Sequence, residues 1–135
     1  MEKYEILEHE ADLKIKAFGR TKEEIFLNML IAMADAFRVE KKEQKYSLKE
    51  IKIKSLDLAT LLVDFLNEVL YLTQVNREIY ERMEFTKLSN NELGARVYGR
   101  SVGKFGEEVK AATYHGLVFN QKSDNAWEAI VIFDV

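Results

Sequence analysis

The stretch that decides the fold runs from residue 57 to residue 73 and reads DLATLLVDFLNEVLYLT. Its apolar side chains recur at helical spacing, which is typical of an amphipathic helix. They form a face broad enough to be well buried, made of Leu58, Leu61, Leu62, Phe65, Leu66, Val69 and Leu72. Asp57 is a favourable N-cap residue. The sequence therefore predicts a core helix that begins after Asp57 and ends near Thr73.

Two carboxylates interrupt this helix, Asp64 and Glu68. They are four residues apart and share one face of the helix. Asp64 falls at the polar edge of the apolar stripe. We expect the pair to be solvated surface, with a contact to another group as the alternative.

Towards the N-terminus, Thr21 and Glu24 form a T-x-x-E capping box that opens a second helix. An apolar stripe from Ile25 to Phe37 continues it, so we expect this helix to end near Phe37. Alternating side chains predict strands at residues 4–7, 13–18 and 48–54. The polar stretch from Glu40 to Gln44 is typical of a loop.

Towards the C-terminus, only strand signals follow the long helix. They predict one hairpin around Asn90-Asn91, a loop marked by Gly103 and Gly106, and a second hairpin around residues 121–125. The predicted strands cover residues 79–88, 93–100, 111–119 and 127–133. The order β-β-α-β-α-β-β-β-β indicates an α+β protein, with two helices packed on a mostly antiparallel β-sheet in a single compact domain.

Composition limits the classes of function. The chain has 135 residues, a net charge of −3 and no cysteine, so disulfides and thiolate metal sites are excluded. A protein that grips RNA directly usually has a basic face, so we expect contact with RNA only through an intermediary. The N-terminus does not resemble a signal peptide, and no apolar stretch approaches the roughly 18 residues of a membrane helix. We expect a soluble, cytoplasmic protein.

Two acidic segments are candidates for a metal site. The first is His9-Glu10-Ala11-Asp12, which lies between two predicted strands and is also compatible with a simple polar turn. The second is Asp134 with the terminal carboxylate of Val135. If the two segments meet, three carboxylates converge, and such a cluster favours a cation or shifted pKa values. Oxygen ligands suit Ca²⁺, Mg²⁺ or Mn²⁺, whereas His9 would admit a softer metal. The alternative is that Asp134 only solvates a strand end.

A third candidate is the segment from Lys110 to His115, which reads KAATYH. A lysine at the start of a strand is usually a solvated edge residue, and a lone histidine is usually a polar surface group. Neither residue is a motif by itself. The chain also lacks G-x-S-x-G, P-loop, G-x-G-x-x-G and H-E-x-x-H motifs.

Together these segments resemble the archease family. The matching motifs span nearly the whole chain in order: His9-Glu10-Ala11-Asp12, the helix opening at residues 19–24, the helix at 61–71, the strand at 110–115 and the ending Phe133-Asp134-Val135. Each motif is weak alone, but the set is specific. Glu10 departs from the pattern, because threonine is common there, and it adds a carboxylate beside the implied metal site.

The resemblance implies that residues 1–135 form one archease-like domain with a Ca²⁺-type site. Its ligands would be Asp12, Asp134 and the Val135 carboxylate, with His9, Glu10 and His115 as accessory residues. It also implies that the chain is not an enzyme but an accessory protein. In that role it accelerates guanylylation of the GTP-dependent RNA ligase of tRNA splicing, and Lys110 contributes to activation. A chaperone-like or modulator role towards RNA-processing proteins is implied as well.

The alternative function is a stand-alone metal-dependent phosphoesterase that uses the same carboxylates. Against it, the sequence shows a single credible metal position and no convincing general base other than His9 or His115. The two functions differ in whether phosphate esters turn over without a ligase.

Overall fold

The computed structural model describes residues 2–8 and 12–135. Within these ranges the chain forms two helices and eight strands, and every strand pairing is antiparallel. The elements are β1 (Tyr4–Glu8), β2 (Asp12–Gly19), α1 (Lys22–Ala36), β3 (Glu40–Lys42), β4 (Ser47–Lys54), α2 (Leu58–Asn76), β5 (Glu78–Leu88), β6 (Glu92–Lys104), β7 (Ala111–Gln121) and β8 (Trp127–Asp134). The predicted α+β class is confirmed.

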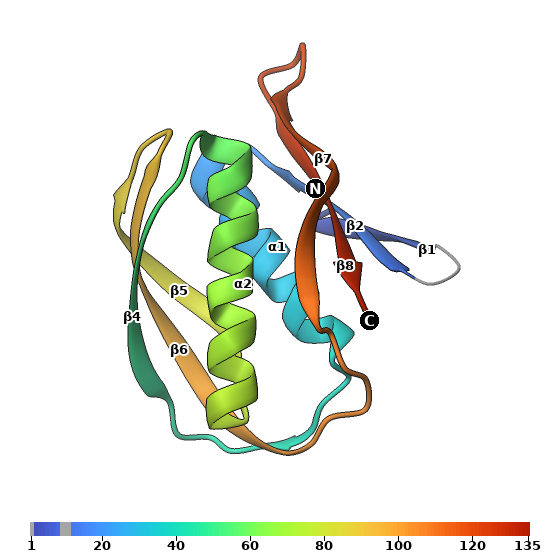
Figure 1. Ribbon diagram of the computed structural model, residues 1–135, viewed down its shortest axis with the longest axis vertical. Coiled ribbons are helices and arrows are strands. Elements are labelled where there is room, and N and C mark those ends of the chain that lie inside the picture. Colours follow the sequence, from blue (N-terminus) through green and yellow to red (C-terminus); the bar gives the residue numbers. More distant parts are fainter. Residues whose placement is uncertain (1, 9–11) are drawn as a thin grey trace.

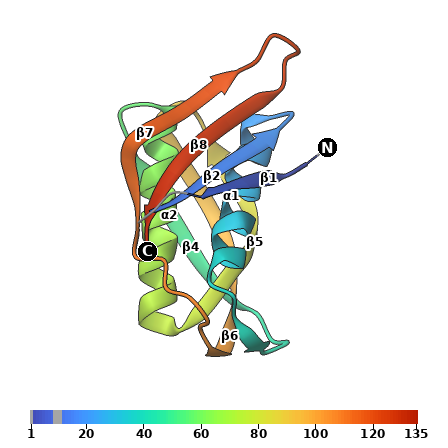
Figure 2. The same cartoon turned by 90° about the vertical axis from the view of Figure 1, so that its right-hand side faces the viewer.

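The strands form two sheets rather than the single sheet that the sequence suggested. The terminal sheet contains both ends of the chain, in the order β1-β2-β8-β7. The central sheet contains β3, β4, β5 and β6, and β6 pairs with all three of the others. Both helices lie between these sheets (Figures 1 and 2) and contact strands of each. The molecule is therefore one compact domain with the helices as its middle layer.

A cluster of phenylalanine rings joins the layers into one core. The ring of Phe26 on α1 lies 5.9 Å from that of Phe65 on α2, 6.1 Å from that of Phe85 on β5 and 6.0 Å from that of Phe119 on β7. Phe26 and Phe65 are fully buried. Truncation of such a side chain to alanine typically costs about 3–5 kcal/mol. This contact set couples both sheets to both helices.

The predicted helix starts are confirmed by their caps. The backbone N–H of Glu24 donates to the Thr21 hydroxyl at 3.1 Å, and that of Thr60 donates to the Asp57 carboxylate at 2.8 Å. α2 continues three residues beyond Thr73, to Asn76. It stops at Arg77, which adopts the left-handed conformation (φ 53°) and donates its N–H to the Thr73 carbonyl at 2.8 Å. Sequence signals missed this stop because the residue in the left-handed position is not glycine.

Two loop predictions are right only in part. Residues 43 and 44 lie in a loop, but Glu40–Lys42 forms β3 and pairs with the end of β6. Gly106 lies in the loop between β6 and β7, but β6 runs through Gly103 to Lys104. Charged side chains are common on short edge strands, since they discourage pairing with other chains, so composition alone hides such a strand.

α2 also corrects the expectation about apolar stretches. Its 19 residues are long and apolar enough to span a membrane by length and composition alone. Eight of them are buried, however, and the helix packs against β4, β5, β6 and β7. A core helix between two sheets accounts for this composition.

Candidate functional site

The ends of three strands meet at one corner of the terminal sheet, which we call the acidic corner (Asp12, Lys110, Asp134 and Val135). The register of β2 and β8 places Asp12 directly opposite Asp134. On the other side of β8, the backbone N–H of Lys110 donates to the Asp134 carbonyl at 2.8 Å. The C-terminus lies beside the start of β7 in both ribbon views (Figures 1 and 2). Residues from the two ends of the chain and from the start of β7 therefore share one site.

Packing under the sheet fixes this register. Ala129, Val131 and Phe133 alternate along β8 and are fully buried, as is Ile15 on β2. A slip of one residue would turn these side chains towards solvent, so the register is strongly determined. The alternation of buried side chains along β2 and β8 therefore places Asp134 opposite Asp12.

Among the residues that the structure describes, the two aspartates have no hydrogen-bond or ion-pair partner. Side chains directly opposite one another in an antiparallel pair have Cβ atoms about 4.5–5.5 Å apart and lie on the same face. No hydrogen bond or ion pair from the described residues reaches either carboxylate. Asp134 is exposed, and Val135 is 49% exposed at the chain end. Like charges placed this closely repel, so a cation bound between them would be favourable.

Lys110 is held at the acidic corner by its backbone and by its neighbours. Its side chain is exposed, whereas Val109 before it is 1% exposed and Ala112 after it is 5% exposed. Two buried residues therefore anchor the segment on either side. This arrangement leaves the ammonium group in solvent next to the two strand ends.

Asn67 on α2 fastens the start of β7, a role that the sequence did not reveal. Its side-chain N–H donates to the Ala112 carbonyl at 3.0 Å, and its side-chain oxygen accepts from the Ala112 N–H at 2.8 Å. The sheet order leaves this side of β7 without a strand partner, so Asn67 satisfies the free edge. The available signal was a polar residue inside the apolar stripe of residues 57–73.

Asp64 is a structural acceptor rather than the solvated group that was expected. It is partly buried and accepts hydrogen bonds from the hydroxyls of Ser55, at 2.5 Å, and Tyr114. The bond to Asp64 is the main reason that the pKa of Tyr114 lies above its usual value, and partial burial adds to it. Glu68 is exposed, as predicted. The alternative contact role is thus the correct one for Asp64, which ties β7 to α2.

Of the three residues predicted to be accessory to the metal site, the structure describes His115. His115 is exposed and lies in an irregular part of β7 between Thr113 and Val118, where Gly116 has a φ of 62°. β-Bulges of this kind redirect side chains and often adjoin functional sites. The other two candidates, His9 and Glu10, lie outside the described residues.

The residues of the acidic corner fit a hard cation by their chemistry. Among the described residues, the side chains of Asp12 and Asp134 offer carboxylate oxygens, which Ca²⁺ and Mg²⁺ prefer. Within residues 2–8 and 12–135, no three His, Asp or Glu side chains are grouped closely enough to hold a metal on their own. The terminal carboxylate would have to complete such a site. Metal binding therefore stays a prediction, now attached to two side chains that lie opposite one another.

Comparison with known proteins identifies the family. Residues 4–135 match the Archease protein family (MTH1598/TM1083). The chain is 34% identical to protein archease of Methanosarcina barkeri, over 98% of this chain and 95% of the relative, and 32% identical to that of Pyrococcus furiosus over the full length of both.

The crystal structure of an archease from Thermotoga maritima, described as a possible chaperone, has a TM-score of 0.66 to this chain. It is 26% identical and covers 96% of this chain and 94% of its own. The match in sequence over nearly the whole chain and the match in fold agree, and this chain belongs to the archease family.

Proposed function

We propose that this chain is an accessory protein that promotes guanylylation of the GTP-dependent RNA ligase of tRNA splicing, with a divalent cation, Ca²⁺ foremost, at the acidic corner. The observation that carries the proposal is the register of β2 and β8, which sets Asp12 opposite Asp134 beside Lys110 at an exposed corner. The archease resemblance supplies the ligase as partner. In this proposal the guanylylation step itself requires no contact between this chain and RNA.

The geometry suits entry into a partner's nucleotide pocket. A cation held there would supply positive charge for triphosphate oxygens. The carboxylates of Asp12 and Asp134 would hold such a cation, and Lys110 would add an ammonium that can pair with phosphate or with a partner carboxylate. Asn67 and Asp64 keep the start of β7 in place by their bonds to Ala112 and Tyr114. A preorganised charged corner is what electrostatic stabilisation of phosphoryl chemistry requires.

The test measures transfer of labelled GMP from GTP to the ligase, with and without this chain. We expect the chain to accelerate transfer at limiting GTP, and a chelator to abolish the acceleration. Lys110→Ala should lower the stimulated rate at least about tenfold, while its free energy of unfolding stays within about 0.5 kcal/mol of the parent. Lys104→Ala, which removes another exposed lysine at the end of β6, is the matched control. Equal stimulation by the parent and by Lys110→Ala, at equal stability, would refute the role of Lys110.

The same preparation separates this function from the phosphoesterase alternative. Incubation of the chain alone with phosphate esters and Ca²⁺, Mg²⁺ or Mn²⁺ should release no phosphate. Metal-dependent release that is lost in Asp12→Asn and Asp134→Asn would instead assign an enzymatic activity to the acidic corner.

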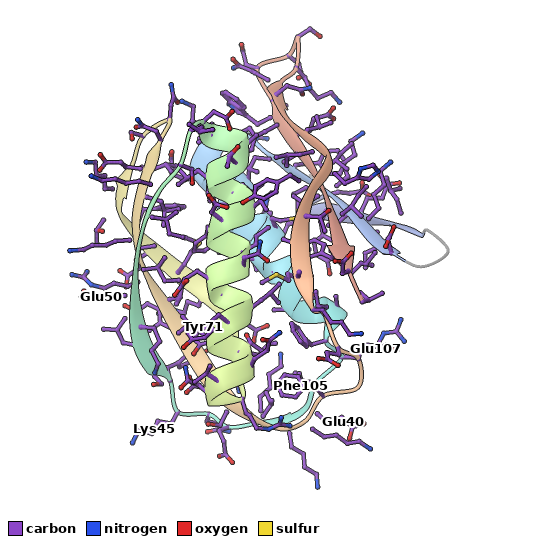
Figure 3. The ribbon with its side chains drawn as sticks, viewed as in Figure 1. Glu40, Lys45, Glu50, Tyr71, Phe105 and Glu107 are labelled. Carbon is purple, nitrogen blue, oxygen red and sulfur yellow. The ribbon has the colours of Figure 1, made fainter. Side chains whose placement is uncertain are left out.

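A second candidate function, chaperone-like modulation of RNA-processing proteins, is favoured by one surface feature. Tyr71 and Val75 are four residues apart on α2 and are 57% and 59% exposed (Figure 3 shows Tyr71 on this helix). Apolar side chains on one helix face are suited to contact with another protein. If they contact a partner, replacing both with serine should reduce suppression of ligase aggregation in light scattering and leave the guanylylation assay intact.

A further inference from the structure

The central sheet has one face on the helices and one face in solvent. Ile51, Leu93, Ala95 and Val97 point towards the helices and are buried. The alternate positions on the same strands form what we call the outer face. In Figure 3 its Glu50 points away from α2. The function proposed above uses none of this surface.

Basic side chains outnumber acidic ones on the outer face, although the whole chain is acidic. The basic residues are Lys52, Lys54, Arg82, Lys87, Arg96 and Arg100, and the acidic ones are Glu50, Glu84 and Glu92. The net charge of the chain is −3, so this face runs against the overall balance. A local basic surface of this kind is the electrostatic signature of contact with a polyanion.

Three of these six cations form ion pairs and three do not, among the described residues. Lys87 pairs with Glu92 at 2.6 Å, Arg96 lies 4.0 Å from Glu50, and Arg100 lies 3.7 Å from Glu81 on β5. Lys52, Lys54 and Arg82 form no ion pair with any described residue. Ammonium groups left in solvent are available for an external anion.

Lys52 and Lys54 on β4 line a groove of about 460 Å³, together with Thr86 and Lys87 on β5 and Glu92 on β6. Lys87 is paired with Glu92 at 2.6 Å, whereas Lys52 and Lys54 have no ion-pair partner among the described residues. The groove floor includes Gly94, where a Cβ would lie 2.6 Å from the Thr86 hydroxyl oxygen, so glycine allows Thr86 to pack over β6. Two ammonium groups and a hydroxyl on the groove walls are donors of the kind that phosphate oxygens accept from.

Aromatic rings lie further along the same face. Tyr98, four residues beyond Gly94 on β6, packs edge-on against Tyr46, with ring centroids 6.4 Å apart. The guanidinium of Arg82 lies 5.4 Å from each of these rings, and that of Arg100 lies 5.4 Å from the Tyr46 ring. Tyr46 is 40% exposed and Arg82 is exposed, so this ring and this guanidinium, beside a basic groove, provide stacking surfaces for unpaired bases.

We infer that the outer face of the central sheet binds single-stranded RNA, with phosphates in the Gly94 groove and bases against Tyr46 and Arg82. Stacking platforms combined with a basic groove favour a single strand over a duplex, in which the bases are already stacked. They also favour nucleic acid over an acidic protein surface, which offers no bases to stack. The choice of RNA over DNA rests on the function proposed above. The face would hold a single-stranded end of the RNA that the ligase joins.

The test uses the full chain without the ligase and measures fluorescence anisotropy of a labelled single-stranded oligoribonucleotide of mixed sequence. We expect binding that weakens steeply as salt rises. The double variant Lys52→Ala/Lys54→Ala should bind roughly tenfold more weakly at low salt, with a salt slope smaller by up to about 1.4. The double variant Lys3→Ala/Lys122→Ala, which removes two exposed lysines beside the terminal sheet, is the matched control and should bind like the parent.

Stacking is tested by Tyr46→Leu, which keeps an apolar side chain and the net charge. We expect at least about fivefold weaker binding to the single strand and no change for a duplex of the same sequence. Three results would overturn the inference: equal losses in the two lysine double variants, a duplex bound as tightly as the single strand, or poly-glutamate displacing the RNA at equal charge. Because the ligase is absent, failure here leaves the guanylylation result standing, and the reverse also holds.

Discussion

The carboxylate of Glu78 and the two aspartate carboxylates of the acidic corner lie in opposite environments. Glu78 is 7% exposed, accepts the Tyr80 hydroxyl at 2.6 Å and lies 3.6 Å from the Lys49 ammonium. Asp12 and Asp134 lie opposite one another and receive no hydrogen bond or ion pair from the described residues. A buried carboxylate with its own partners stabilises the fold, whereas a half-buried and an exposed aspartate without a partner among the described residues are available for a ligand.

The neighbours of Glu78 show how completely that site is closed. Burial is the main reason that the pKa of Tyr80 is raised, and the bond to Glu78 raises it further. A Cβ at Gly99 would lie 2.5 Å from the Tyr80 ring, so glycine is needed for the ring to reach this position. The acidic corner has no comparable enclosure, since Asp134 is exposed.

The largest expected change in stability comes from a substitution at the buried Glu78. Glu78→Ala leaves the buried Tyr80 hydroxyl without its acceptor and Lys49 without its counter-ion, so the free energy of unfolding should fall by about 2–3 kcal/mol. Urea unfolding measures it. Glu107→Ala, at an exposed glutamate, is the control and should change stability by less than about 0.5 kcal/mol. An equally small change for Glu78→Ala would remove the distinction between the two sites.

The next effect concerns the support of the acidic corner. Asn67→Ala removes both bonds to the Ala112 backbone and should lower the free energy of unfolding by about 1–2 kcal/mol. Amide hydrogen exchange at Ala112 should accelerate more than exchange at Val131, because β8 keeps its partners on both sides. Glu68→Ala changes the adjacent exposed residue of the same helix and should leave exchange unchanged. Unaltered exchange at Ala112 in the asparagine variant would show that the edge is held by other contacts.

A smaller effect, of opposite sign, is expected at the acidic corner. Asp134→Asn removes one of two adjacent like charges, so the chain without metal should become more stable by about 0.5 kcal/mol. The parent should gain stability with added Ca²⁺, by about 2.7 kcal/mol at a hundredfold excess over Kd, and the variant should gain much less. Thermal unfolding with and without Ca²⁺ measures both, and Asp12→Asn should behave in the same way. Equal Ca²⁺ effects in the parent and in both variants would exclude metal binding at this pair.

The smallest expected change in stability concerns the hydrogen bond from Tyr114 on β7 to Asp64 on α2. Tyr114→Phe removes one hydrogen bond to Asp64, which keeps its bond from Ser55, so we expect a loss of about 0.5 kcal/mol at neutral pH. The pKa of Tyr114 is raised in the folded state, so this contribution is complete below the ordinary tyrosine pKa near 10. It disappears as pH rises through the elevated value. Unfolding of parent and variant between about pH 7 and 11 tests this, and a difference that grows with pH would contradict it.

Local patterns predicted most of the elements. The apolar stripe of residues 57–73 and the caps at Thr21 and Asp57 gave both helices, because spacing and capping depend on residues within one or two turns. Alternation gave β2, whose inward residues include the buried Ile15, and the strand signals around a polar turn gave β8, whose inward residues include the buried Val131 and Phe133. The hairpin turn at Asn90-Asn91 is also confirmed, since Leu88 pairs with Leu93.

Only the tertiary structure decided which strands pair and which distant residues become neighbours. β3 and the division into two sheets depend on backbone pairing with β6, which any side-chain pattern permits. The clamp of Asn67 on Ala112 joins residues 45 positions apart. By sequence alone, Asp12 and Asp134 were candidates at the two ends of the chain. Their direct opposition follows from the register of β2 and β8, which the buried faces of both strands fix through long-range packing.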